Sequence, residues 1–356
     1  MSHSLNKEAP TLSLEVASIE HQARSTLRKT LVVCGVLAVL LLVITIIAAT
    51  LGSEPVPVRD VLRAIFTGGT STGALTSTQR AILFDIRLPR IVLAATVGAS
   101  LAAAGASYQA LLRNALAEPY LLGISNGAAV GTMVALVFIG GNEWTRPVMA
   151  FAGALAATFV VYRLARGRAG ASSERLILAG VIVTTFQSSV IVFITTLMDA
   201  TRIRSFTFWL LGDLSQASSG SIWIAVASTI IGVAALTLNA RPLNLMMLGE
   251  RDAFDLGVEV ERVRLQVFLA ASLLVGVSVA LSGSVGYVGL VVPHLVRMSF
   301  SGDNRLTIPA TALAGAAFVV VADTVARTVI APRELPVGAI TALVGAPLFV
   351  YLLKRR

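Results

Sequence analysis

Long apolar stretches separated by short polar ones run along the chain from residue 31 almost to its end. Ten of these stretches have about 15–25 residues, and about 20 apolar residues of α-helix cross the hydrocarbon core of a bilayer. The pattern therefore predicts an all-α polytopic membrane protein with about ten transmembrane helices. The predicted spans are 31–51, 88–112, 121–140, 147–165, 175–198, 221–239, 264–282, 286–300, 307–328 and 337–353.

The most charged internal stretch, residues 241–264, lies between the sixth and seventh spans and carries four arginines and five acidic residues. Unpaired charges are costly inside a bilayer, so this stretch is expected outside it. Gly249 and Gly257 are natural helix stops and predict two short helices, 243–248 and 251–256, that pack on each other. The first helix would expose Leu245, Met246, Met247 and Leu248. The residues alone leave two interpretations open, a docking surface for another protein and a solvated connector.

The fifth span has an unusually polar centre. Its polar residues are Thr184, Thr185, Gln187, Ser188 and Ser189. Such side chains commonly form hydrogen bonds between helices, but they also line aqueous pathways. Five polar residues in six positions exceed what two helix contacts require, which favours a pathway without excluding packing.

Small residues predict close helix packing in two other places. The second span is dense in Ala, Gly and Ser, and the glycines that begin the eighth span indicate close packing or a broken helix. Between the first two spans, residues 52–87 are expected to form an outer loop, with a short amphipathic helix at 56–66. A second short amphipathic helix is expected within 202–220 on the same side.

Charge placement gives the orientation. The chain is 56% hydrophobic and 13% charged, with a mean hydropathy of +0.82 and a net charge of +9. If both termini are cytoplasmic, the 28 Lys and Arg residues divide into 18 inside and 10 outside, which follows the positive-inside rule. The positive charge is therefore explained by membrane topology, and nucleic acid is not an expected partner.

Residues for catalysis and metal binding are scarce. The chain has one cysteine, Cys34, and three widely separated histidines, so neither a disulfide nor a metal-ligand spacing is present. Its few lysines lie near the ends and exclude a Walker A motif, so the protein is not expected to be an enzyme and any ATP hydrolysis belongs to a separate chain. Asp323 is the one acid expected within a span. It either pairs with Arg327 or serves an ion-coupled secondary transporter that has no ATPase partner.

Seven motifs together resemble the FecCD (BtuC-like) family of type II ABC importer permeases, which serve cobalamin, ferric siderophores and haem. They are RLPR (87–90), VGASLAAAGASYQ (97–109), RNALAEPYLLGISNGAAVG (113–131), LNLMMLGERDAFDLGV (243–258), SGSVGYVGLVVPHLVR (282–297), ADTVAR (322–327) and ELPVGAITALVGAP (334–347). One departure is Ala115, where the family usually has proline, which concerns the rigidity of that inner turn.

The pattern of spans and charges gives a cytoplasmic tail at 1–30, which the resemblance does not cover, and a single transmembrane domain at 31–356. The resemblance implies a multi-pass permease of the cell (inner) membrane. Two copies would form a homodimer, surrounded by membrane lipid, with one pathway at the dimer interface. Two cytoplasmic ABC ATPase subunits would bind ATP and Mg²⁺, so this chain would bind no cofactor itself. A periplasmic or extracellular binding protein would deliver cobalamin or an iron chelate (a ferric siderophore or haem). A scaffold without transport activity is a further alternative.

The resemblance also implies roles for individual residues. Docking of the binding protein is assigned to Arg87, Arg90 and Arg327. Coupling to the ATPase is assigned to Leu245, Met247, Leu248, Gly249, Glu250, Ala253, Leu256 and Gly257. The cytoplasmic gate is assigned to Asn114, Leu116, Ser172, Ser173 and Glu174, of which the last three are also expected to cap the fifth span. The pathway lining is assigned to Thr184, Gln187 and Ser188, with the fifth and tenth spans beside it.

Overall fold

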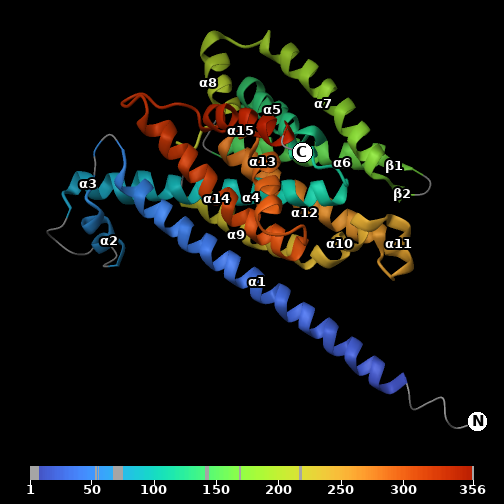
Figure 1. Cartoon of the computed structure of the whole chain (residues 1–356). Helices are drawn as coiled ribbons and strands as arrows, with labels where there is room; N and C mark the ends of the chain where they lie inside the picture. The colour runs from blue at the N-terminus through green and yellow to red at the C-terminus, as the bar shows by residue number, and fades with distance from the viewer. Residues whose placement is uncertain are drawn as a thin grey trace, which may run out of the picture.

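The computed structural model describes residues 8–52, 54, 56–66, 75–140, 144–167, 170–215 and 219–354, which are almost entirely helical (Figure 1). The helices are α1 (Glu8–Thr50), α2 (Val58–Phe66), α3 (Ser77–Ala81), η1 (Ile82–Arg87), α4 (Leu88–Leu111), η2 (Pro119–Leu122), α5 (Ile124–Val134), η3 (Ala135–Ile139), α6 (Thr145–Ala165), α7 (Ser173–Thr195), α8 (Ala200–Leu210), α9 (Ser219–Leu238), α10 (Ala240–Leu248), α11 (Glu250–Asp255), α12 (Val260–Ser282), α13 (Val288–Ser299), α14 (Asn304–Thr328) and α15 (Val337–Lys354). A two-stranded hairpin, β1 (Arg166–Gly167) and β2 (Gly170–Ala171), joins α6 to α7.

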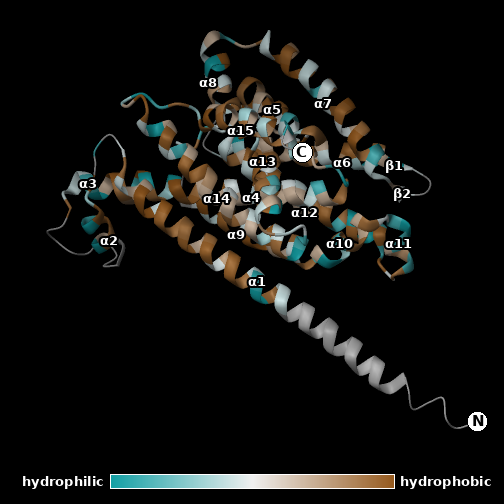
Figure 2. Cartoon of the chain, in the orientation of Figure 1, coloured by the Kyte–Doolittle hydropathy of each residue, from teal (hydrophilic) through white to brown (hydrophobic). Residues whose placement is uncertain are grey.

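The predicted fold class is confirmed. Within the described residues, seven helices are long and apolar enough to cross a membrane, and three shorter apolar helices cover 124–139, 288–299 and 337–352. Together they follow the order of the ten predicted spans. Figure 2 shows hydrophobic colour along these helices, while hydrophilic residues gather at α2 and α3 and at α10 and α11. The protein is an all-α polytopic membrane protein.

The second span lies at the centre of the bundle, as its small residues predict. Helix α4 packs against α9, α12, α13 and α14, and most of it is buried. A Cβ atom added at Gly98 would overlap the backbone of Gly315, and one added at Gly105 would overlap the backbone of Gly289. Close packing through these glycine pairs is therefore confirmed, since any larger side chain would force the backbones apart.

Two helices begin earlier than the sequence pattern predicts. Helix α1 starts at Glu8, so most of the expected N-terminal tail continues the first span as one helix. The expected outer loop ends at Thr76, whose side chain caps α3 in a capping box with Gln79. From there the helix runs through the π turn η1 into α4. The wider π turn accommodates Pro89, which has no N–H and would crowd a regular helical turn.

The polar segments that were predicted on opposite sides of the membrane lie at opposite ends of the bundle (Figure 1). Helices α10 and α11 and the hairpin β1–β2 gather at one end, and α2 and α3 lie at the opposite end (Figure 1). The predicted amphipathic helices are present as α2 and α8. The chain is non-helical between α12 and α13, where Gly283 and Tyr287 have positive φ angles of 68° and 67°. The predicted glycine-rich break therefore exists.

Candidate functional site

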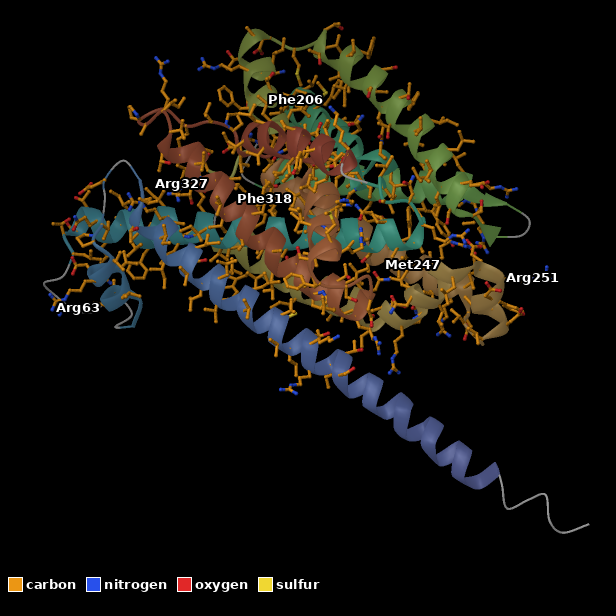
Figure 3. The ribbon with its side chains drawn as sticks, viewed as in Figure 1. Arg63, Phe206, Met247, Arg251, Phe318 and Arg327 are labelled. Atoms are coloured by element: carbon orange, nitrogen blue, oxygen red, sulfur yellow. The ribbon has the colours of Figure 1, made fainter. Side chains whose placement is uncertain are left out.

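The charged stretch between the sixth and seventh spans forms the two predicted short helices. Gly249 joins α10 to α11 in an extended conformation, and Gly257 ends the pair with a φ of +86°. The apolar residues that reach the surface are Met247 and Leu248 of α10, Phe254 of α11, and Leu256. Leu248 is 72% exposed and Phe254 is 69% exposed, so this end of the bundle presents apolar side chains on helices that are not among the candidate membrane spans. Figure 3 shows Met247 and Arg251 at this end.

The prediction that Met246 is exposed was wrong. Its side chain is only 2% exposed, because it lies one helical turn after Leu243 and on the same buried face. Leu245 is half-buried and Ala253 is fully buried, so the accessible surface of the two helices is smaller than the assigned set. Phe254 was missing from that set. An aromatic residue in an otherwise charged loop was the available signal for it.

Hydrogen bonds fix α10 to the start of α14. The amide of Asn244 donates to Asp303 over 2.7 Å, and its oxygen accepts from the backbone and side chain of Asn304 over 2.9 and 2.8 Å. Burial alone would raise the pKa of Asp303, but hydrogen bonds from Arg305 and Asn244 lower it below its ordinary value. The carboxylate therefore stays charged and holds the end of the short-helix pair against α14.

The two predicted gate segments lie side by side. Ser172 caps α7 by accepting from the backbone of Arg175 over 3.3 Å, which confirms the predicted cap. The Ser173 hydroxyl donates to the carbonyl of Leu111 at the end of α4, over 3.1 Å. Asn114 follows shortly after and accepts from the backbone of Leu116 over 2.9 Å. Leu116 and Glu174 are exposed. The gate function of these residues stays a prediction.

The polar centre of α7 forms hydrogen bonds with α5. Asn126 donates to the Ser188 hydroxyl over 2.9 Å and to the Thr184 carbonyl over 3.2 Å. Gln187 is buried against α5, so close to Gly123 and Gly127 that a Cβ atom on either glycine would touch its amide. Helix packing therefore uses these polar groups. That these residues and the exposed face of α7 line a transport pathway stays a prediction.

The three predicted docking arginines lie toward the opposite end, where Figure 3 labels Arg327. All three are buried and bonded within the chain. Arg90 donates to Asp323 over 2.9 Å and to Glu334 over 2.6 Å. Arg327 lies 3.2 Å from Asp323 and donates to the carbonyl of Ala48. Arg87 donates to the carbonyls of Ala49 and Glu54. A cavity of about 410 Å³ opens beside these arginines and Glu334.

Asp323 therefore has two arginine partners, including the predicted Arg327. These two ion pairs account for the buried carboxylate as part of a structural charge cluster. The arrangement gives no support to the alternative of an ion-coupled secondary transporter. Among the described residues, no group of three or more His, Cys, Asp or Glu side chains is arranged to hold a metal ion.

Comparisons with known proteins cover nearly the whole chain. The model of the FecCD transport family matches residues 40–355. The cobalamin import system permease protein BtuC of Halobacterium salinarum is 39% identical, over 89% of this chain and 94% of its own. The hemin transport system permease protein HmuU of Yersinia pestis is 38% identical, over 90% of this chain and 95% of its own. The structure of a metal-chelate type ABC transporter in an inward-facing conformation superposes with a TM-score of 0.80 at 29% identity, covering 91% of this chain and 99% of that one.

Proposed function

The chain belongs to the FecCD transport family, and from this premise we propose that it carries cobalamin or an iron chelate, either a ferric siderophore or haem, across the cell membrane. The relatives named for cobalamin and for hemin are almost equally similar to it, so both classes of cargo stay candidates. In this proposal the cargo is delivered by a binding protein on the outer face, and both termini are cytoplasmic.

The observation that carries the proposal is the exposed apolar surface of α10 and α11. Leu248 and Phe254 lie on two short helices that are fixed to α14 by Asn244, so a force applied there reaches the transmembrane helices. No Walker A motif occurs in the chain, so the energy must come from another subunit. We assign this surface to an ABC ATPase, one copy for each permease.

A homodimer is part of the proposal. Helix α7 lies at an edge of the bundle (Figure 1) and exposes Phe186 by 69%, while α15 exposes Leu343 by 73%. A second copy that covers these helices would enclose a pathway between the subunits. The segments around Ser173 and Asn114 would then close its cytoplasmic end.

Docking of the binding protein is assigned to the cavity beside Arg87, Arg90 and Arg327. Because Glu334 and Asp323 already neutralise part of this charge, a carboxylate on the binding protein would have to displace Glu334 from Arg90 or add to the cluster. Such charge pairs favour recognition and association rate more than affinity.

The transport cycle follows from these assignments. ATP binding closes the ATPase dimer and displaces α10 and α11, and the displacement turns the pathway from one open side to the other. A conduit that binds its cargo weakly releases it on the inner side. The packing of small and apolar residues in the described spans is consistent with such weak binding.

The test is the Leu248→Asp variant, expressed with the ABC ATPase encoded by the same organism. A charge at the most exposed apolar position of α10 should abolish co-purification of the ATPase and ATP-dependent uptake into liposomes that contain the binding protein. Val58→Asp is the matched control, because Val58 is an exposed apolar residue of α2 at the opposite end of the bundle (Figure 1) and outside the predicted spans, and the variant should keep both activities. Retention of the ATPase by Leu248→Asp would contradict the assignment of this surface.

A further inference from the structure

A buried arginine near the start of α12 has none of the roles assigned above. Arg264 lies in the second turn of α12, next to the exposed loop, yet its side chain is only 3% exposed. Burial of a guanidinium is unfavourable unless carboxylates and carbonyl groups surround it. Its partners therefore show which segments this arginine holds together.

Arg264 contacts two segments besides its own helix. Its Nη2 atom lies 2.6 Å from a carboxylate oxygen of Glu250, which is the first residue of α11. Its Nη1 atom donates to the carbonyl of Ala171, the last residue of β2, and to Glu261 over 2.9 Å. One guanidinium thus joins the proposed ATPase surface to the strand that directly precedes Ser172.

Glu261 completes the attachment of the hairpin. Its second carboxylate oxygen accepts from the backbone of Ala171 and from the hydroxyl of Tyr162, each over 3.2 Å. Gly170 has a φ of +94°, and a Cβ atom there would lie 2.7 Å from the same carboxylate. Both backbone groups of Ala171 are therefore bound to the Glu261–Arg264 pair, and only glycine at position 170 permits this approach.

The connection continues to the other gate segment. Ala171 is followed by the α7 cap Ser172 and then by Ser173, whose hydroxyl donates to Leu111 at the end of α4. A shift of Ala171 is therefore passed to the start of α7 and to the turn that contains Asn114. In Figure 1 the hairpin and α11 lie at the same end of the molecule.

We propose that Arg264 is a positioning residue that transmits the displacement of α10 and α11 to the gate segment at Ser172 and Ser173. This inference rests on the proposed roles of those two regions. When α11 moves, Glu250 displaces the Arg264 guanidinium through their ion pair. Arg264 and Glu261 then displace Ala171 through their hydrogen bonds to its backbone. The guanidinium is buried while the Glu250 and Glu261 side chains are 37% and 45% exposed, so the pairs are partly shielded from water and are stronger than fully exposed surface pairs.

The decisive variant is Glu250→Gln. It removes the negative charge from the Arg264–Glu250 ion pair, which reaches α11, but leaves the hydrogen bonds of Arg264 to Glu261 and Ala171 intact. The Glu250 side chain is 37% exposed, so its neutral replacement is compatible with folding. A second variant, Arg264→Lys, keeps the positive charge, but a single ammonium group lacks the planar fork that contacts Glu250 and Ala171 at the same time.

The matched control is Arg262→Gln on the same helix. Within the part of the chain that the structure describes, Arg262 pairs only with Glu259 over 3.3 Å, and both side chains are largely exposed, so little should change when the pair is lost. This control removes an arginine–glutamate pair of the same chemistry two residues away, without touching the hairpin.

All variants are assembled with the ATPase and the binding protein in liposomes, and the ATP hydrolysed per cargo imported is measured. A spin label at Leu178, introduced as Leu178→Cys in a Cys34→Ser background, reports nucleotide-dependent movement between the two copies of α7. We expect Glu250→Gln and Arg264→Lys to raise the ATP hydrolysed per cargo by about tenfold, the effect of losing one partly buried ion pair. We also expect the label distance to stop responding to nucleotide, while Arg262→Gln behaves like the unmodified protein.

A purely structural role gives a different result. In that case the variants lower the yield or thermal stability of the complex, but the assembled fraction imports cargo at the unmodified ATP ratio with a normal label response, and the inference is overturned. If the unmodified permease binds no ATPase, the proposed function fails and the inference fails with it. If Leu248→Asp releases the ATPase but Glu250→Gln leaves coupling unchanged, only the inference fails.

Discussion

Glu118 is a half-buried carboxylate between the predicted gate turn and the break that precedes α13. One of its oxygens accepts from the backbone of Tyr287 over 3.0 Å. Burial raises the pKa of Glu118, and the hydrogen bond from Tyr287 opposes the rise only in part. A single side chain thus holds a residue whose left-handed backbone conformation is unfavourable without glycine.

This raised pKa makes stability depend on pH. A group whose folded-state pKa is raised stabilises the fold fully below its unfolded pKa, and this contribution is lost as pH rises through the folded pKa. Glu118→Gln keeps an acceptor for Tyr287 but has no charge to bury. We expect the Tm of the variant to exceed that of the unmodified protein increasingly as pH is raised from about 4 toward neutrality. Thermal unfolding in detergent across this range provides the measurement.

Asp303 is the internal reference for the same titration. Its pKa is lowered, so its contribution to stability is present above its ordinary pKa and is lost as pH falls through the folded value. The unmodified protein and Glu118→Gln both lose the stability contribution of Asp303 at low pH. Only the difference between their Tm values therefore reports on Glu118. A difference that does not change with pH would refute the assignment to Glu118.

At the scale of the helices, close backbone contact decides how α4 is packed. The glycine pairs of α4 with α13 and α14 leave no space for a side chain, and apolar packing in lipid depends on such contacts because no hydrophobic effect drives helices together there.

The Gly105→Val variant tests this contact. Its side chain would overlap the backbone of Gly289, and overpacking of this kind destabilises proteins by about 1–3 kcal/mol. We expect a Tm lower by several degrees in the purified permease. Gly35→Val on α1 is the control, because no described atom beyond the neighbouring backbone of its own helix lies within 4 Å of the added Cβ atom, and its Tm should not fall. Equal Tm values for the two variants would show that the α4–α13 contact tolerates separation.

At the scale of the whole molecule, the unequal burial of the helices shows which of them have large apolar surfaces that either lipid or another protein must cover. Only 17% of the α9 window is buried and 28% of the α7 window, although both helices are long enough to cross the membrane. The proposed homodimer places α7 at the subunit interface and leaves α9 toward lipid. Exposure alone does not separate these two environments, but proximity to a second copy does.

Cross-linking distinguishes a helix at the proposed subunit interface from a helix that faces lipid. In a Cys34→Ser background, Phe186→Cys on α7 should give a covalent dimer with a short bifunctional maleimide in membranes. Trp223→Cys on α9, which replaces a side chain that is 73% exposed, should remain monomeric under the same treatment. Dimers formed through position 223 and not through 186 would place the interface on the other face of the subunit.

The sequence by itself determined the fold class, the order of the spans, the two short helices at 240–255 and the amphipathic helices at the other end, because these depend on local apolar length, glycine stops and helix periodicity. It also offered the pairing of Asp323 with Arg327 as one of two interpretations of that acid, and the structure shows this pair, four residues apart on one face of the helix.

Only the tertiary structure decided which face of each helix is buried. Helices that are apolar on every side have no polar face to mark their exposed surface, so the burial of Met246 and of the predicted docking arginines did not follow from the pattern. The same holds for Arg90 with Glu334, 244 positions apart, and for Arg264 with Glu250 and Ala171. Such contacts depend on how distant segments pack, and no local spacing specifies them.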